Sequence, residues 1–132
     1  MAPIHHVTVE LQAAQVDDCV AFYGLLGFGQ VPVPDGIAGR ALWLEDESGS
    51  GQQVHLMFAE AESPRTGHFA LVAPDFDTTT EALRAAGHEV DPRRAHWGSP
   101  RAYVRDPAGN LIELMREPPS GRGAGIAREP RK

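Results

Sequence analysis

Four residues of the types that bind divalent metal ions stand at matching places in the two halves of the sequence. His6 and His68 each lie at the start of a half, and His55 and Glu113 each lie near its end. Three imidazoles and one carboxylate suit a first-row divalent ion such as Zn²⁺, Fe²⁺, Mn²⁺, Co²⁺ or Ni²⁺. The residues therefore predict that one divalent metal ion is bound by these four side chains.

The match rests on a repeated strand, turn and returning strand. Residues 40–46 lead through a Gly/Ser/Gln turn into Val54-His-Leu-Met57, and residues 101–106 lead through Pro-Ala-Gly-Asn into Ile112-Glu-Leu-Met115. A pattern that returns at a fixed offset indicates a duplicated structural unit. His55 and Glu113 occupy the same position in the two returning strands.

A strand and a helix are predicted ahead of each repeated hairpin. The strands are expected at residues 4–11 and 68–72. The helices are expected from Asp17 to Gly27 and from Asp77 to Gly87, with an aspartate as the N-cap (Asp17 or Asp18 in the first helix) and a glycine as the stop. The predicted order is strand, helix and three strands, twice over, with residues 93–99 as a loop.

Alternation in the first strand separates an apolar face from a polar one. Val7, Val9 and Leu11 share one face, and His6, Thr8 and Glu10 share the other. By the same alternation His5 is predicted on the apolar side, where it has a structural role. His88 and His96 are interpreted as loop residues.

The chain of 132 residues is predicted to hold one domain, residues 1–116, followed by a flexible tail at 117–132. The first module is expected at residues 4–60 and the second at residues 67–116.

Composition excludes several kinds of partner. The net charge of −6 argues against nucleic acid, because phosphate binding needs a basic face. The apolar runs are too short to span a bilayer, and no leader segment is evident. The single cysteine, Cys19, rules out an internal disulfide, suits a reducing cytoplasm and is expected to fill the core.

Three segments resemble a known superfamily. They are Ile4-His-His-Val7, the helix segment with Phe22-Tyr23 and Leu26-Gly27-Phe28, and Asp106-Pro-Ala-Gly-Asn-Leu-Ile-Glu-Leu114. Together they look like the vicinal oxygen chelate superfamily, which includes glyoxalase I, fosfomycin-resistance enzymes, methylmalonyl-CoA epimerase, extradiol dioxygenases and bleomycin-resistance proteins. The resemblance covers residues 4–116.

The resemblance implies an α+β fold of two βαβββ modules, which form a cupped mixed sheet with the helices on its outer face. It places the ligand positions of the family on His6, His55, His68 and Glu113. Members use the metal to stabilise an enolate, an alkoxide or a bound oxygen species, while a neighbouring group moves a proton. Glu113 is the expected base, with His55 in reserve.

A glyoxalase I-like lyase or isomerase, acting on a small oxygenated substrate through a metal-stabilised enolate, is the first hypothesis. His55 departs from glyoxalase I, which usually has glutamate or glutamine there. A fosfomycin-resistance-like thiol transferase is the alternative, because His6-Val-Thr8 and Tyr103 resemble that group, and an extradiol-type dioxygenase is another. The non-enzyme alternative is a bleomycin-resistance-like protein that sequesters a drug in an aromatic pocket, for which Phe58 and Trp97 are also candidates.

Substrate-binding residues are expected beside the metal. Arg40 and Arg101 occupy equivalent repeat positions, and each could clamp a carboxylate or phosphate. The remaining candidates share a strand face with the ligands or belong to an aromatic pocket, and they are Thr8, Trp43, Met57 and Tyr103. A C2 homodimer is the expected assembly, with the ligand pairs coming from one chain or from two.

Overall fold

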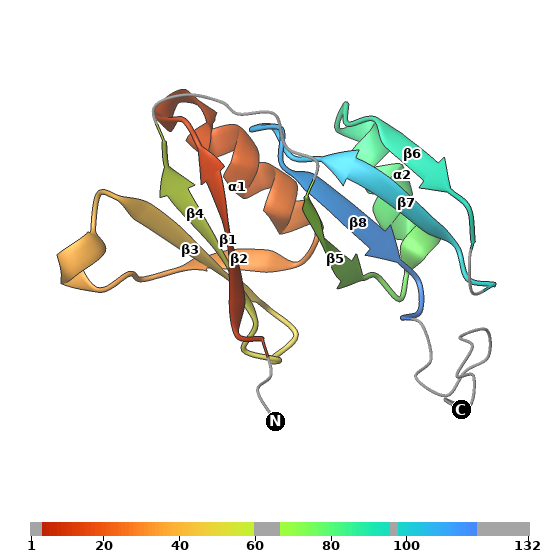
Figure 1. The fold of residues 1–132 in the computed structure, drawn as a ribbon, viewed down its shortest axis with the longest axis horizontal. Coiled ribbons are helices and arrows are strands. Elements are labelled where there is room, and N and C mark those ends of the chain that lie inside the picture. Colours follow the sequence, from red (N-terminus) through yellow and green to blue (C-terminus); the bar gives the residue numbers. More distant parts are fainter. Residues whose placement is uncertain (1–3, 60–66, 96–97, 119–132) are drawn as a thin grey trace, which may run out of the picture. The chain divides into compact units, whose positions relative to one another are not determined.

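The computed structural model describes residues 4–59, 67–95 and 98–118 of the chain (Figure 1). The chain divides into two compact units. Unit 1 comprises residues 1–67 together with 105–111, and unit 2 comprises residues 68–104 together with 112–132. The turn of the second hairpin, residues 105–111, therefore belongs to unit 1, although the segments on both sides of it belong to unit 2.

Unit 1 contains a helix and a mixed four-stranded sheet in the order β1-β4-β3-β2. Strand β1 runs parallel to β4, whereas β2 with β3 and β3 with β4 pair antiparallel. Short 3₁₀ turns lie at Ala13–Gln15 and Asp35–Ile37. The elements are β1 (His6–Leu11), α1 (Val16–Leu25), β2 (Phe28–Val31), β3 (Ala41–Asp46) and β4 (Gln53–Phe58).

Unit 2 repeats this order with a helix and a four-stranded sheet in the order β5-β8-β7-β6. Its elements are β5 (His68–Val72), α2 (Phe76–Ala85), β6 (Val90–Arg93), β7 (Arg101–Arg105) and β8 (Leu111–Met115). Pro92 lies in β6, an edge strand, where a missing backbone N–H is tolerated. The predicted α+β fold of two βαβββ modules is confirmed.

The predicted helix ends are right, but the predicted caps are wrong. Gly27 and Gly87 follow α1 and α2 with φ of +92° and +95°, the left-handed conformation that stops a helix. At the other end, Gln15 and Asp75 occupy the N-cap positions, and neither makes a side-chain cap bond. Asp17 and Asp77 lie two residues after the N-cap and Asp18 lies three after it, in the first turn, where their negative charge interacts favourably with the helix dipole.

Alternating residues of the strands form the core of each unit. Val54 and Leu56 in β4 and Ile112 and Leu114 in β8 are almost completely buried, and each pair flanks one of the predicted ligands. The other large buried side chains of unit 1 include Cys19, Phe22, Tyr23 and Leu44, and those of unit 2 include Leu83 and Val104. The core of each sheet therefore fixes which way His55 and Glu113 face.

The turn between β7 and β8 is held by a buried carboxylate. Asp106 is 3% exposed. Its Oδ2 accepts hydrogen bonds from the Tyr23 hydroxyl (2.7 Å) and the Asn110 amide (2.8 Å). Its Oδ1 accepts from the backbone N–H groups of Ala108 (2.9 Å) and Asn110 (2.8 Å). Four donors thus satisfy one carboxylate, and we call this arrangement the Asp106 clasp.

The clasp joins three elements of unit 1. Tyr23 comes from α1, and the Asn110 side chain also donates to the backbone oxygen of Glu10 in β1 (2.9 Å). Burial, and then the nearby Asp106 carboxylate, raise the pKa of Tyr23 well above its ordinary value, so its hydroxyl remains a donor. The Asp-Pro-Ala-Gly-Asn segment is therefore a structural device.

Removing the Tyr23 hydroxyl is expected to destabilise the protein. Tyr23→Phe deletes a buried hydrogen bond to a carboxylate, which costs about 1.5–3 kcal/mol of the free energy of unfolding. Tyr103→Phe removes the same atom from a partly exposed ring and is expected to cost less than about 0.5 kcal/mol. Chemical denaturation of both variants measures the difference, and equal stabilities would contradict a structural role for the clasp.

Cys19 is expected to be chemically inert in the folded protein. It is fully buried, as predicted for a core residue, and burial followed by the charge of Asp106 raises the pKa of its thiol to about 12. Since the thiolate is the reactive form, a thiol reagent should modify Cys19 only as the chain unfolds. Modification of one equivalent at a rate independent of denaturant would show that the site opens locally.

Some predictions fall outside the described residues. These are most of the predicted tail (119–132), His96 and Trp97. Within the described part of the chain, neither helix has the length and apolar character that a membrane crossing requires.

Candidate functional site

The first pair of predicted ligands, His6 and His55, lies on the two paired strands β1 and β4 of unit 1. The parallel register sets His6 opposite Gln53 and Thr8 opposite His55. The imidazole rings stack with their centroids 3.8 Å apart and their planes 17° apart. The sheet therefore brings this pair into direct contact.

His55 is held from two further sides. The indole of Trp43, directly opposite in β3, stacks on the other face of its ring with centroids 4.2 Å apart. His55 Nε2 lies 2.7 Å from Gln53 Oε1. Because the Gln53 amide nitrogen donates to Glu45 (2.8 Å), its oxygen faces His55 and accepts the Nε2 proton. Nδ1 then keeps the free lone pair of the ring.

The His55 ring is neutral at physiological pH. It is 8% exposed, and its burial, with smaller effects of His6 and His5, lowers its pKa to about 4. A neutral ring whose second nitrogen is fixed by a hydrogen bond is the form in which histidine binds metals. The interaction with Gln53 was not predicted, although residues two apart in a strand share a face.

His5 lies where the alternation did not predict it. Its Nδ1 is 3.0 Å from the Nδ1 of His6, and its ring centroid is 6.4 Å from that of His55. Strand β1 begins at His6, so strand alternation does not extend to His5. The prediction that this residue belongs to the apolar side is wrong, and His5 joins the imidazole cluster.

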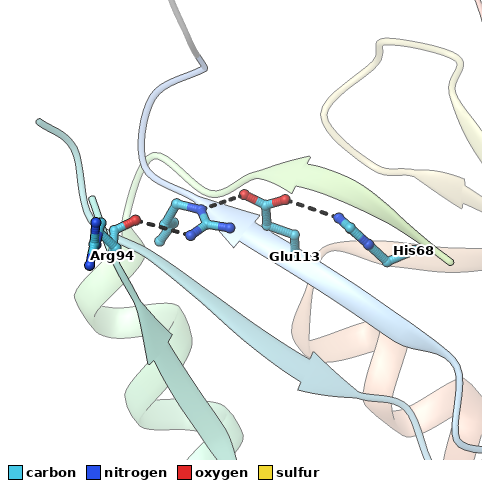
Figure 2. Close-up of polar contacts among 4 residues, drawn as sticks. His68, Arg94 and Glu113 are labelled. Atoms are coloured by element: carbon cyan, nitrogen blue, oxygen red, sulfur yellow. Dashed lines mark hydrogen bonds and ion pairs between the residues drawn. The ribbon is translucent and has the colours of Figure 1, made fainter. Parts of the chain in front are cut away.

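The second pair of predicted ligands, His68 and Glu113, lies on the neighbouring strands β5 and β8 of unit 2. His68 Nε2 is 3.3 Å from Glu113 Oε1. Glu113 is 7% exposed, and its other oxygen, Oε2, accepts a hydrogen bond of 2.8 Å from Arg101 Nε. Figure 2 shows the carboxylate between the guanidinium and the imidazole.

Arg101 and Tyr103, both in β7, complete the neighbourhood of Glu113. The ring centroids of Tyr103 and His68 lie 5.2 Å apart. The guanidinium carbons of Arg93 and Arg101 lie 4.9 Å and 5.5 Å from the centroid of the Tyr103 ring. The bonds from Asp106 N to Asn110 O and from Arg116 N to Pro100 O fix the hairpin register. This register sets Tyr103 opposite Glu113 and Arg101 diagonal to it, within reach of a long side chain.

The other predicted substrate residues are less closely associated with the ligands. Thr8 is exposed on β1, next to His55 in the register. Met57 is 44% exposed and lies two residues beyond His55. Arg40 is exposed just before β3, where its backbone oxygen accepts from the N–H of Phe58. Their roles remain predictions.

The chemistry of each pair fits binding to a divalent metal ion. The donors are three imidazoles and a carboxylate, one imidazole is neutral with its second nitrogen anchored, and the carboxylate is hydrogen-bonded on one oxygen. The stacked rings of His6 and His55 do not aim their in-plane lone pairs at one point, so one ring must turn to share an ion. Among the described residues, no group of three or more potential ligands is arranged to hold a metal ion.

The stacked Trp43 provides an optical probe of His55. An imidazolium quenches the indole on which it stacks, so in the Trp97→Phe variant Trp43 fluorescence should fall as the pH drops through about 4. Adding His55→Gln should remove this step, and circular dichroism separates it from acid unfolding. A midpoint near the ordinary value of 6.5 would show that His55 is more solvated than the structure indicates.

Solved structures of other proteins share this fold. A protein from Bacillus anthracis assigned to the glyoxalase family is 29% identical, with a TM-score of 0.76 over 87% of this chain and 94% of that one. Lactoylglutathione lyase from Agrobacterium tumefaciens is 23% identical (TM-score 0.65; 87% and 93% covered). The fosfomycin resistance protein FosX from Listeria monocytogenes, in complex with Mn(II) and 1S,2S-dihydroxypropylphosphonic acid, is 16% identical (TM-score 0.65; 89% and 92% covered).

The sequence itself matches a family model. Residues 3–114 match the model described as the glyoxalase/bleomycin resistance protein/dioxygenase superfamily, and no curated protein matches the chain. The matched range includes all four predicted ligands and the Asp106 clasp. With its duplicated βαβββ units, the chain belongs to the glyoxalase/bleomycin resistance protein/dioxygenase superfamily, the vicinal oxygen chelate proteins.

Proposed function

We propose that the chain is a metal-dependent enzyme, a glyoxalase I-like lyase or isomerase that acts on a small oxygenated substrate through an enolate. The observation that carries the proposal is the duplication of a supported ligand pair. Each unit contains two ligand-type residues in contact on its first and last strands, and one of the two is anchored by a neighbouring side chain. The duplication of the fold explains why the two units have similarly packed cores. It does not require that residues able to bind a metal occupy the first and last strands of both units.

In this proposal His6, His55, His68 and Glu113 hold one divalent ion. When bound, the ion polarises a substrate carbonyl and offsets the negative charge that develops on its oxygen. The donor set accommodates Zn²⁺, Ni²⁺, Fe²⁺, Mn²⁺ or Co²⁺. The neutral state of His55 supports its role, because only the unprotonated ring has a lone pair to give.

The protein's own residues then handle the proton. Because a carboxylate can loosen from an ion and accept a proton, Glu113 Oε1 is the proposed acceptor of a proton from the carbon next to the substrate carbonyl, whereas Oε2 is already occupied by Arg101. The contact of Oε1 with His68 Nε2, at 3.3 Å, is the longer of the two contacts of the carboxylate and the easier one to exchange. Nδ1 of His55 is the reserve acceptor.

Substrate binding is assigned to the groups that surround the ligands. Trp43 and Tyr103 offer flat aromatic surfaces, and Thr8 offers a hydroxyl beside His55. The exposed guanidinium of Arg40 suits a substrate carboxylate or phosphate, and Met57 offers an apolar contact. We further propose that the protein is a homodimer. We also propose that it is cytoplasmic, since a single buried, unpaired cysteine suits a reducing compartment.

A drug-binding protein is the second candidate. The rings of Trp43, His55 and His6 in unit 1 form a stack, and a flat aromatic ligand could continue such a stack at either end. The description of the superfamily includes bleomycin resistance proteins. This function needs the aromatic surface but no metal, so metal content distinguishes the two candidates.

Metal analysis tests the proposal. Purified protein titrated with Zn²⁺, Ni²⁺ and Mn²⁺ is expected to bind about one ion per chain, since the four donors make one site. His68→Ala should weaken binding at least about 100-fold, because it removes a direct ligand. The control is His88→Gln, a histidine change after α2 in the same unit. A protein that binds no ion, or a His68→Ala variant as tight as the wild type, would favour the drug-binding function.

A further inference from the structure

The carboxylate of Glu113 is divided between two partners of different character. Arg101 Nε donates to Oε2 at 2.8 Å, and both side chains are about nine-tenths buried (10% and 9% exposed). His68 Nε2 approaches Oε1 at 3.3 Å. A buried, charge-assisted bond of 2.8 Å is among the strong ones, so Oε2 is the firmly held oxygen and Oε1 the exchangeable one.

Arg101 is itself anchored at places other than Glu113. One terminal nitrogen donates to the backbone oxygen of Arg94 at 3.0 Å (Figure 2), and the guanidinium carbon lies 5.5 Å from the centre of the Tyr103 ring. A planar guanidinium held at two edges has little freedom to rotate. It therefore imposes its direction on the carboxylate rather than following it.

We propose that Arg101 is the positioning residue for Glu113, and that it holds Oε2 so that Oε1 alone is offered to the metal ion and the substrate proton. This inference rests on the proposed function. It assigns the guanidinium to a carboxylate of the protein, whereas the equivalent Arg40, exposed before β3, remains the candidate for a substrate anion. The two arginines at equivalent repeat positions thus take different roles.

The arrangement involves a compromise that makes the proposal testable. A positive charge beside a ligand carboxylate weakens its attraction for a cation, but a fixed orientation avoids the entropy of ordering the side chain on binding. A loose Glu113 could also offer both oxygens to the ion and change its coordination number. Positioning therefore predicts that loss of Arg101 alters both the affinity and the geometry of the site.

The experiment compares Co²⁺ binding by the full-length wild type, Arg101→Met, Arg101→Lys and Arg116→Met. Competition with a chelator gives the affinity, and the visible absorption of bound Co²⁺ reports the coordination geometry. Arg101→Met is expected to weaken binding about 10- to 100-fold and to change the spectrum. Arg116→Met removes the same charge from a solvent-exposed pair with Asp77 in the same unit, and it should match the wild type.

Arg101→Lys is the control for misfolding of Arg101→Met. It keeps a positive charge beside the buried carboxylate but lacks the planar guanidinium. It should fold like the wild type by circular dichroism and still show an altered spectrum. Wild-type affinity and spectrum in both Arg101 variants, or tighter binding, would overturn the inference and leave the metal site standing. Failure of the wild type to bind Co²⁺ would overturn the proposed function as well.

Discussion

The burial of one carboxylate, that of Asp106, is the constraint on which much of unit 1 depends. A charge removed from water is very costly unless hydrogen bonds replace its hydration, and here four donors do so. Those donors belong to the turn itself and to α1, and Asn110 extends the network to β1. Residues far apart in the sequence are thereby committed to one arrangement. Strand β8 leaves that arrangement at Leu111, two residues before Glu113.

Two carboxylates in the same hairpin, those of Asp106 and Glu113, have different kinds of hydrogen-bond partners. Asp106 is surrounded by neutral donors, and each of its oxygens has two. Glu113 faces an arginine and a histidine, and its contact with the histidine is long enough to be exchanged. A saturated group is suited to holding structure, whereas a group with a replaceable partner is suited to binding or proton transfer. The chemistry of the donors, more than burial, separates the structural Asp106 from Glu113, to which a functional role is proposed.

Much of the architecture could be predicted from the sequence because the pattern is duplicated. Strand alternation and glycine stops located the hairpins and the helix ends, and repeat equivalence selected His6, His55, His68 and Glu113. The helix starts were harder, since Asp17 and Asp77 are as favourable in the first turn as at the cap. His5 was misplaced because alternation applies only inside a strand.

The supporting contacts of the candidate site could not be predicted in the same way. The bond from Arg101 to Glu113 depends on a long side chain that reaches diagonally across two strands. The orientation of the Gln53 amide toward His55 depends on Glu45, which takes its nitrogen. Such contacts involve three residues at once, whereas sequence patterns report one position at a time.

The parallel pairing of β1 with β4, together with the bond from Asn110 to Glu10, has a consequence for biosynthesis. Strand β1 leaves the ribosome well before its sheet partner β4, which begins at residue 53, and the backbone oxygen of Glu10 gains the Asn110 donor only after residue 110 has been made. Residues 68–104 of unit 2 are therefore synthesised before the hydrogen bond from Asn110 to Glu10 in unit 1 can form. Until then the nascent strand presents unpaired backbone groups, which expose it to misassembly.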